Sequence, residues 1–520
     1  MSDETDRQEE VFACLADPKT HGGQDVQRID THAASVFLAG DRALKVKRAV
    51  RFPFLDYSTL TKRKEACETE LAVNTPYAPE IYRGVVAVTR EPDGKLAIGG
   101  SGEPVEWAVR MHRFDEKRTL DHIPGEIDEK LADALGRVVA GAHAKAPRID
   151  AQAWIVAFGS YIDEHVGAFR ARPDIFPAAE IDALARASHT AYERIVPLLR
   201  ERGRLGFARR IHGDLHLGNI VLIGGKPVLF DAIEFSDIIA SGDVLYDLAF
   251  LLMDLLERGL RQAANVVLNR YLAETRRVED LDGLATLPFF LSMRAAIRAR
   301  VTAARLERIA KSEQASIAHA ARAYFVFALH AIAPPAPRFV AVGGLSGTGK
   351  TKLARMLAPH IEPMPGAVIL RSDVERKALF GLAETEKLSP DAYTDEVTAR
   401  IYTTLADKAR RIVAAGHSVI VDAVFARPQE RVAIAEAAKS ANLPLRGLFL
   451  AADTETRVAR IGARAHDASD ADAEIAQAQE HYDVGPLDWT PIDASSTPEA
   501  TLELSLQALA VNKTMKTKGI

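Results

Sequence analysis

The sequence predicts a protein of two domains, a mixed α+β domain followed by an α/β domain with a parallel sheet. Its 520 residues exceed one ordinary domain of about 100–200 residues. Three prolines within residues 331–338 deny a helix its amide donors and favour an extended linker. The pattern changes across that linker. Residues 240–330 have helical periodicity, whereas Phe339–Val342 is typical of a short buried strand.

Composition excludes several classes of protein. A net charge of -5, with 48% hydrophobic and 26% charged residues, indicates a globular chain and disfavours a nucleic-acid partner. Cys14 and Cys67 are the only cysteines, so neither a disulfide framework nor a cysteine zinc site is expected. Residues 1–12 are too charged for a signal peptide, and no apolar run of 18 residues is evident. We therefore expect a cytoplasmic protein without a membrane segment.

These features divide the chain into five expected segments. They are a charged N-terminal segment (1–24), a first domain (25–330), a Pro-rich linker (331–338), a second domain (339–512) and a basic tail (513–520). In the first domain, strands are expected at Ala34–Leu38 and Ala43–Val46, and a helix at Thr59–Thr75. Residues 126–205 should be mainly helical, with breaks near Pro173 and Pro177.

One motif of the first domain carries polar residues at a fixed spacing. Residues 212–219 have the sequence HGDLHLGN, in which Asp214 is followed after four residues by Asn219. This spacing is typical of a kinase-type catalytic loop. Its aspartate orients the acceptor hydroxyl or accepts its proton, and its asparagine holds Mg²⁺. Twelve residues after Asn219, an apolar strand ends at Asp231, where the second metal ligand is expected.

A kinase-type site also needs a lysine for the ATP phosphates. Ala43 and Lys45 share one face of a predicted strand, as in the Ala-x-Lys pattern of that lysine. Lys45 is therefore the predicted ligand, with Lys47 on the same face as the alternative. A glutamate of the following helix should pair with the lysine, and the sequence does not choose among Glu65, Glu68 and Glu70.

These motifs, with Tyr246-Asp247-Leu248-Ala249 further on, resemble the aminoglycoside phosphotransferase and choline kinase superfamily over roughly residues 25–330. The resemblance implies a bilobal, protein-kinase-like fold. It also implies that Asp214 is the catalytic base, that Asn219 and Asp231 ligate Mg²⁺, and that Asp247 braces the catalytic loop. A degenerate, inactive member is the alternative, which the presence of all three polar residues disfavours.

The second domain opens with a glycine-rich loop between a strand and a helix. Residues 344–351 have the sequence GLSGTGKT, the signature of a P-loop. The backbone amides of such a loop surround the β-phosphate, its lysine bridges the β and γ oxygens, and its threonine ligates Mg²⁺. We therefore predict nucleotide binding by Gly344, Ser346, Gly347, Thr348, Gly349, Lys350 and Thr351. Lys350 is also a predicted catalytic residue, and Thr351 a predicted metal ligand.

Two carboxylates follow later strands of the second domain. Asp373 comes after an apolar strand, and Arg376 lies one helical turn beyond it. This Asp-x-x-Arg resembles the acceptor element of polynucleotide-kinase-like P-loop kinases, which implies that Asp373 activates a hydroxyl and Arg376 grips an acidic substrate or the phosphate. Asp422 ends the next buried strand, the position of a Walker B metal ligand.

Three arginines of the second domain recur at helical spacing. Arg457, Arg460 and Arg464 are three and four residues apart, which places them on one helix face. Similar kinases use such arginines on a closing lid, so Arg460 and Arg464 are predicted to bind the nucleotide. A solvated stripe of arginines is the alternative.

As a whole, the chain resembles bacterial proteins in which an aminoglycoside phosphotransferase-like kinase is fused to a P-loop ATP-binding domain. This implies transfer of the γ-phosphoryl group of ATP (or GTP), with Mg²⁺, to a hydroxyl of a small molecule such as a sugar or nucleoside. Two alternatives are one active kinase with a nucleotide-sensing domain, and polynucleotide or nucleotide kinase activity in the second domain. Residues 150–210 mix acidic residues with arginines, which disfavours a polycationic aminoglycoside.

Overall fold

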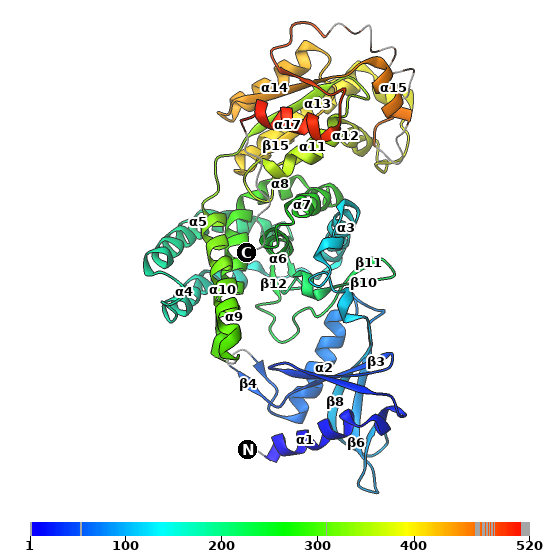
Figure 1. Cartoon of the computed structure of the whole chain (residues 1–520), viewed down its shortest axis with the longest axis vertical. Coiled ribbons are helices and arrows are strands. Elements are labelled where there is room, and N and C mark those ends of the chain that lie inside the picture. The colour runs from blue at the N-terminus through cyan, green and yellow to red at the C-terminus, as the bar shows by residue number, and fades with distance from the viewer. Residues whose placement is uncertain are drawn as a thin grey trace. The chain divides into compact units, whose positions relative to one another are not determined.

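The computed structural model describes residues 3–52, 55–307, 309–462, 468–470, 474, 477, 479, 482 and 484–510. Two compact units are present, and chain contacts cluster within each: Met1–Ser160 with Leu199–Leu251, and Tyr161–Leu198 with Leu252–Ile520. Figure 1 follows the elements of both units by colour along the chain.

The first unit contains a six-stranded antiparallel sheet with the order β1-β2-β3-β8-β6-β7. Its strands are β1 (Val26–Asp30), β2 (Ala34–Ala39), β3 (Arg42–Lys47), β6 (Tyr82–Arg90), β7 (Leu96–Ile98) and β8 (Glu103–His112). A short hairpin of β4 (Arg51–Phe52) and β5 (Leu55–Asp56) precedes helix α2 (Leu60–Asn74). Thr59 caps α2 by accepting from the Lys62 amide. The expected strands and helix in this region are confirmed.

The charged N-terminal segment forms helix α1 (Asp3–Ala16), which packs on this sheet. Val11, Phe12 and Leu15 of α1 are buried in one cluster with the sheet residues. A helix with one apolar stripe gains stability by burying that stripe, whatever the charge of its other face. The segment is therefore part of the folded unit.

The rest of the first unit brings the catalytic-loop motif together with Asp231. Strands β10 (Ile220–Ile223) and β11 (Lys226–Leu229) form an antiparallel hairpin in which Ile220 pairs with Leu229. Residues just before β10 and just after β11 therefore lie at the same end of the hairpin. Around it lie α3 (Glu129–Lys145), β9 (Ala208–Arg210), β12 (Ser241–Asp243) and the start of α6 (Val244–Glu257). The helices α4 (Ala151–Arg170) and α5 (Ala178–Arg204) confirm the expected helical region.

The second unit also contains Tyr161–Leu198 of α4 and α5. After Leu251 it continues with helices α7 (Arg261–Thr275), α8 (Val278–Gly283), α9 (Leu287–Ala304) and α10 (Lys311–Ile332). Helix α10 packs along α9, where Ser292 donates to the Ala328 carbonyl at 2.9 Å. By length and composition alone α10 is apolar enough to cross a membrane, which was not expected from the sequence. Core helices of globular proteins and signal sequences pass the same test, and 28% of the apolar window of α10 is buried in this structure. The helix also runs into the expected linker, ending at Ile332.

A five-stranded parallel sheet follows, with the order β14-β15-β13-β16-β17. The strands are β13 (Phe339–Gly344), β14 (Val368–Arg371), β15 (Val419–Asp422), β16 (Leu445–Ala451) and β17 (Thr490–Asp493). The helices are α11 (Lys350–Leu357), α12 (Ser372–Leu379), α13 (Asp395–Ala414), α14 (Pro428–Ser440), α15 (Thr454–Gly462) and α17 (Pro498–Ala508). Helix α7 covers edge strand β14, where Asn269 accepts from the Ile369 amide at 2.7 Å and donates to the Ala367 carbonyl at 3.2 Å. The predicted fold class, α+β followed by α/β with a parallel sheet, is confirmed.

Candidate active sites

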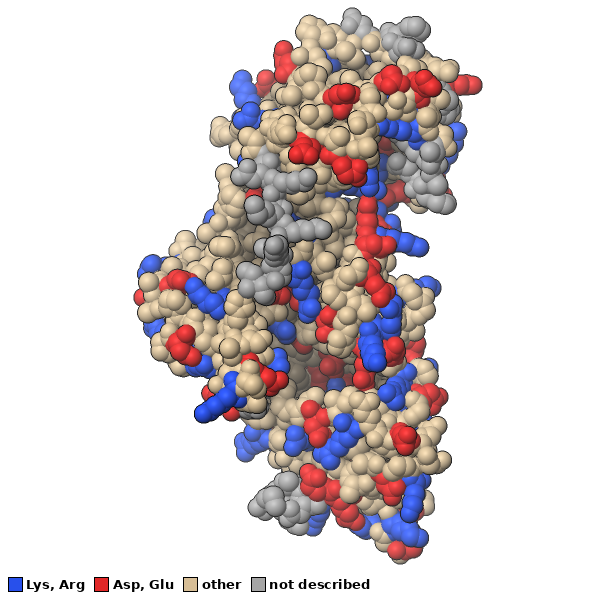
Figure 2. Space-filling view, viewed as in Figure 1, with Lys and Arg blue, Asp and Glu red and all other residues tan. Residues whose placement is uncertain are grey.

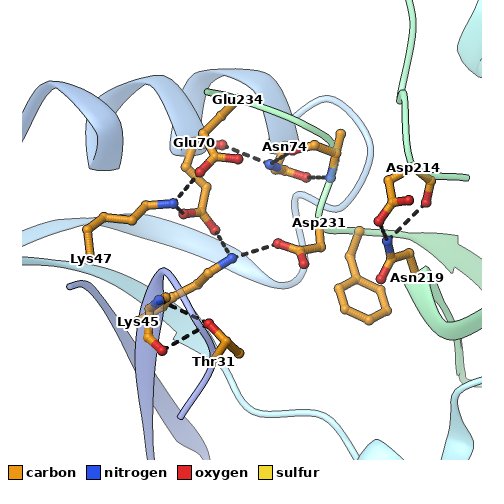
Figure 3. A network of polar contacts seen from close by, with 12 residues as sticks. Thr31, Lys45, Lys47, Glu70, Asn74, Asp214, Asn219, Asp231 and Glu234 are labelled. Carbon is orange, nitrogen blue, oxygen red and sulfur yellow. Dashed lines mark hydrogen bonds and ion pairs between the residues drawn. The ribbon is translucent and has the colours of Figure 1, made fainter. Parts of the chain in front are cut away.

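The first candidate site contains Lys45 between two carboxylates (Figure 3). The Lys45 ammonium lies 2.8 Å from Glu70 Oε1 on α2 and 2.6 Å from Asp231 Oδ1. Of the three candidate glutamates, Glu70 is fully buried, whereas Glu65 and Glu68 are exposed. The structure therefore identifies Glu70 as the partner that the sequence left open.

Lys47 pairs with the other oxygen of the same glutamate. Its ammonium lies 2.6 Å from Glu70 Oε2 and also contacts Glu234. Burial alone would raise the pKa of Glu70, but the two lysines outweigh burial and lower this pKa to about 2. Burial likewise opposes the charge of Lys45, but Asp231 and Glu70 raise the pKa of Lys45 well above its ordinary value. Glu70 and Lys45 are therefore charged at neutral pH.

The catalytic-loop motif places Asp214 and Asn219 in direct contact. Asn219 Nδ2 donates to Asp214 Oδ2 at 3.0 Å and to the Asp214 carbonyl at 3.0 Å, so Asn219 Oδ1 is the atom that could ligate the predicted metal. His216 Nδ1 accepts from the Gly218 amide, so Nε2 carries the proton of the neutral ring and lies 3.3 Å from Asp214 Oδ2. The Asp214 side chain is 41% exposed. It can therefore meet an acceptor from solvent while its orientation is fixed.

Asp247 holds the backbone of this loop. Its two oxygens accept from the His212 amide at 2.9 Å and the Gly213 amide at 3.0 Å, and His143 Nε2 lies 3.2 Å from one of them. Gly213 has φ +84°, and a Cβ there would lie 3.1 Å from Ile233. His212 is buried, and its Nε2 donates to the Phe230 carbonyl, which ties the loop to the segment that bears Asp231. This arrangement matches the bracing role implied for Asp247.

Asp231 itself has φ +61°, a left-handed conformation that is uncommon for a residue other than glycine. Its amide donates to Tyr82 Oη at 3.2 Å. The buried Asn74 side chain accepts from the Ala232 amide at 2.7 Å and donates to the Ala232 carbonyl at 3.2 Å. Such strain persists where surrounding contacts determine the backbone, as they do on both sides of Asp231.

The second candidate site is the P-loop between β13 and α11. Thr351 Oγ1 donates to Asp422 Oδ2 at 2.6 Å, so the two predicted metal ligands lie together. Lys350 Nζ donates to the Leu345 carbonyl at 3.1 Å. Gly347 has φ +87°, and a Cβ there would lie 2.6 Å from the Arg457 carbonyl, so the loop backbone requires glycine. The loop thus has the strand-loop-helix context of a phosphate-binding site.

A pocket of about 1230 Å³ extends from the P-loop and is also lined by Asp373 and Arg376. Gly344 ends β13 beside the loop, Ser346, Gly347, Thr348 and Gly349 line the pocket, and Asp373 lies in the first turn of α12. Arg376 is buried and donates to the Ala392 carbonyl at 2.6 Å and to Thr398 Oγ1 at 3.3 Å. Its guanidinium also lies 5.0 Å from the centre of the Tyr393 ring. Arg376 therefore shapes the acceptor side of the pocket through contacts with the protein.

The arginines of α15 have different environments. Arg457 is buried, and its Nε donates to the Ser346 carbonyl of the P-loop at 2.8 Å. Arg460 lines the pocket and donates to the carbonyls of Ala494 (2.7 Å) and Ser496 (2.9 Å). Arg464 lies outside the described residues. Both described arginines hold loops around the nucleotide side of the pocket.

The donor atoms at both sites fit Mg²⁺ bound together with a nucleotide. Carboxylate, amide and hydroxyl oxygens are the ligands that Mg²⁺ prefers, and it commonly uses one or two carboxylates with substrate phosphates. Within the part of the chain that the structure describes, no cluster of three or more His, Cys, Asp or Glu side chains could hold a metal alone. Asn219 with Asp231, and Thr351 with Asp422, would therefore hold Mg²⁺ in company with phosphate oxygens.

Comparisons with known proteins agree with this geometry. Residues 26–281 match the family model described as a phosphotransferase enzyme family, and residues 339–483 match one described as an AAA domain. Uncharacterized proteins of Mycobacterium tuberculosis and Mycobacterium bovis are 31% identical over 472 residues, which cover 88% of this chain and 90% of theirs. The chain belongs to their family. The two family models identify a phosphotransferase-type kinase domain and a P-loop domain in this chain, which indicates kinase-type phosphotransfer.

Two solved structures align with parts of this chain. A choline/ethanolamine kinase family protein from Mesorhizobium loti is 15% identical, covering 63% of this chain and 99% of its own, with a TM-score of 0.37. A gluconokinase from Sinorhizobium meliloti is 18% identical, covering 34% of this chain and 92% of its own, with a TM-score of 0.25.

Several residues at these sites were not singled out from the sequence. Asn74 and Glu234 support the Asp231 segment, and Gln479 Oε1 accepts from the Ser346 amide at 2.7 Å. Asp470 accepts from Lys377 Nζ at 3.1 Å and from Tyr393 Oη at 2.7 Å, beside the pocket. Asn74 lies one turn after Glu70 on α2, which is a signal that helical spacing could have provided. The other three have no local signal, because their partners are distant in the sequence.

Proposed function

We propose that this protein is an ATP-dependent phosphotransferase with two active sites, each transferring the γ-phosphoryl group to a hydroxyl of a small molecule. The observation that carries the proposal is that both sites place a lysine beside side-chain oxygens of the kinds that Mg²⁺ prefers. Lys45 lies 2.6 Å from Asp231, and in the other site Lys350 precedes Thr351, whose hydroxyl lies 2.6 Å from Asp422. A module that only senses nucleotide would not need Asp214 or Asp373, the carboxylates that we assign to the acceptor.

In the first site, the oxygen of the acceptor hydroxyl would bond to the γ-phosphorus as the bond between that phosphorus and ADP breaks. Asp214 would receive the proton of the hydroxyl. Lys45 would bind the α- and β-phosphates, while Asn219 and Asp231 hold Mg²⁺. Bound Mg²⁺ would neutralise charge on the transferring group. Asn219 and His216 both contact Asp214 Oδ2, which supports a fixed orientation of the base.

In the second site, Asp373 would play the part of Asp214, and the P-loop would bind the phosphates. The pocket that joins the P-loop to Asp373 supports this assignment, since donor and acceptor need one continuous cavity. A volume of about 1230 Å³ suits a nucleotide together with a small acceptor.

The surface charge supports small molecules as partners. Basic and acidic residues number 66 and 71, and Figure 2 shows the two signs mixed over the visible face. Nucleic-acid-binding proteins instead gather basic residues into a patch or stripe.

The test is ATP turnover by the Asp214→Asn and Lys350→Ala variants across a panel of sugars, nucleosides and other alcohols. We expect each variant to lose turnover with one set of acceptors and to keep it with another. Lys439→Ala, an exposed lysine of α14, is the control and should retain both activities. Full activity of both site variants on every acceptor would contradict the proposal, and loss of all turnover in one variant would reduce it to a single active site.

A further inference from the structure

A buried second lysine distinguishes the first site from a simple lysine-glutamate pair. Lys45 and Lys47 are two residues apart on β3, so both side chains leave the same face of the strand. The Lys45 side chain is 15% exposed, whereas that of Lys47 is 2% exposed. Each takes one oxygen of Glu70, as Figure 3 shows. Only Lys45 is placed to meet a phosphate.

The second partner of Lys47 is Glu234, three residues after the metal ligand Asp231. The Glu234 side chain is 8% exposed and also accepts from Tyr57 Oη at 3.1 Å. The Lys47 ammonium lies 5.4 Å from the centre of the Tyr57 ring, within cation-π range. Gln8 of α1 donates to the Lys47 carbonyl at 2.8 Å, which fixes the lysine backbone as well. Lys47 is therefore held by protein groups on its ammonium, along its side chain and at its backbone.

The contact between Lys47 and Glu234 completes the support of the strained Asp231 segment. Tyr82 holds the Asp231 amide and Asn74 holds both polar groups of Ala232, on the N-terminal side of Glu234. The ion pair anchors the C-terminal side to β3. The Ile233 amide already donates to the His212 carbonyl at 3.0 Å, so the ion pair adds a side-chain anchor one residue further along the segment.

The charges explain why one lysine could not both bind phosphate and keep the buried Glu70 paired. Lys45 contacts Asp231 directly, and a nucleotide with its metal would draw these two groups to new partners. Glu70 is fully buried and would then lose one of its two cations. Lys47 keeps Glu70 paired whatever Lys45 binds, which avoids an uncompensated buried charge.

From this arrangement we infer that Lys47 is a positioning residue that, through Glu234, fixes the Asp231 carboxylate for metal binding. This inference rests on the proposed phosphotransfer at the first site. Groups that orient a metal ligand commonly change metal affinity by about 10–100-fold when they are removed. Lys47 therefore acts on the metal, whereas Lys45 acts on the phosphates.

The experiment measures Mn²⁺ binding with a non-hydrolysable ATP analogue by electron paramagnetic resonance. The full chain carries Lys350→Ala and Thr351→Val, so that the P-loop site does not contribute. We expect Lys47→Met to weaken Mn²⁺ binding about 10-fold or more. Lys95→Met, at a lysine 83% exposed, should leave the affinity unchanged.

A second readout needs neither metal nor nucleotide. Hydrogen exchange by mass spectrometry should show faster exchange over residues 230–235 in Lys47→Met. If that variant fails to fold, Glu234→Gln tests the same contact while Lys47 keeps its pair with Glu70. Unchanged Mn²⁺ affinity and unchanged hydrogen exchange in both Lys47→Met and Glu234→Gln would overturn this inference but not the proposed function of the site. No Mn²⁺-nucleotide binding in the parent with an intact first site would instead overturn the proposed function of that site.

Discussion

The lysines proposed to bind phosphate in the two candidate sites are held in opposite ways. Lys45 is held by Glu70 and Asp231, which come from α2 and from a loop 186 residues away. Lys350 donates to the Leu345 carbonyl, five residues away in the same loop. The lysine of the first site is thus held by ion pairs from distant elements, and the lysine of the second by a backbone carbonyl of its own loop. Ion-pair substitutions should therefore affect the first site and its unit far more than the second.

The largest expected effect comes from removing the shared carboxylate. Glu70→Gln leaves two lysines without the charge that both contact, and breaking a buried ion pair in this way costs about 3–5 kcal/mol. Urea unfolding followed by circular dichroism measures the loss. Glu68→Gln, at an exposed position of the same helix, should change stability by less than about 0.5 kcal/mol. An equal loss of stability in Glu70→Gln and Glu68→Gln would show that the first site does not depend on this ion pair.

Acid should weaken the same cluster selectively. The pKa of Glu70 is lowered to about 2 in the folded chain from its ordinary 4.5. The stability that this shift contributes is complete above about pH 4.5 and is lost as the pH falls toward 2. The unfolding free energies of wild type and Glu70→Gln should therefore converge over this range, by at most about 1.4 kcal/mol per pH unit. A constant difference between pH 5 and pH 2.5 would show that Glu70 is not held by its lysines.

A smaller effect is expected from the neutral contacts beside Asp231. Asn74→Ala leaves the amide and carbonyl of Ala232 without their partner, and a buried unsatisfied polar group costs about 1–3 kcal/mol. Thermal unfolding should show this loss. Gln152→Ala, at an exposed position of α4, is the control. An Asn74→Ala variant as stable as wild type would mean that Asp231 keeps its conformation unaided.

The contrast between the sites also explains what the sequence could predict. The P-loop lies within one strand, one loop and one helix, so its residues are evident from their spacing. Asp214, Asn219 and Asp231 share one hairpin and its flanks, and their neighbourhood was also predictable. Glu70 could not be distinguished from Glu65 and Glu68, because the buried face of α2 is polar and hydrophobic periodicity does not reveal it. That face consists of Arg63, Cys67, Glu70 and Asn74.

Tertiary contacts decide the roles that remained open. Arg376 was expected to grip an acidic group, and it donates to the Ala392 carbonyl and to Thr398. The charged N-terminal segment gave no sign that Val11, Phe12 and Leu15 would be buried in a sheet. In each case the partner lies on another element, so local sequence carries no signal for it.

The most direct test of the account is the number of nucleotides that one chain binds. Isothermal titration with a non-hydrolysable ATP analogue and Mg²⁺ should give two sites per wild-type chain. Lys350→Ala and Lys45→Met should each leave one site, and the double variant none. A single site in the wild type, or the loss of both sites in either single variant, would contradict the claim that this chain carries two separate phosphotransfer sites.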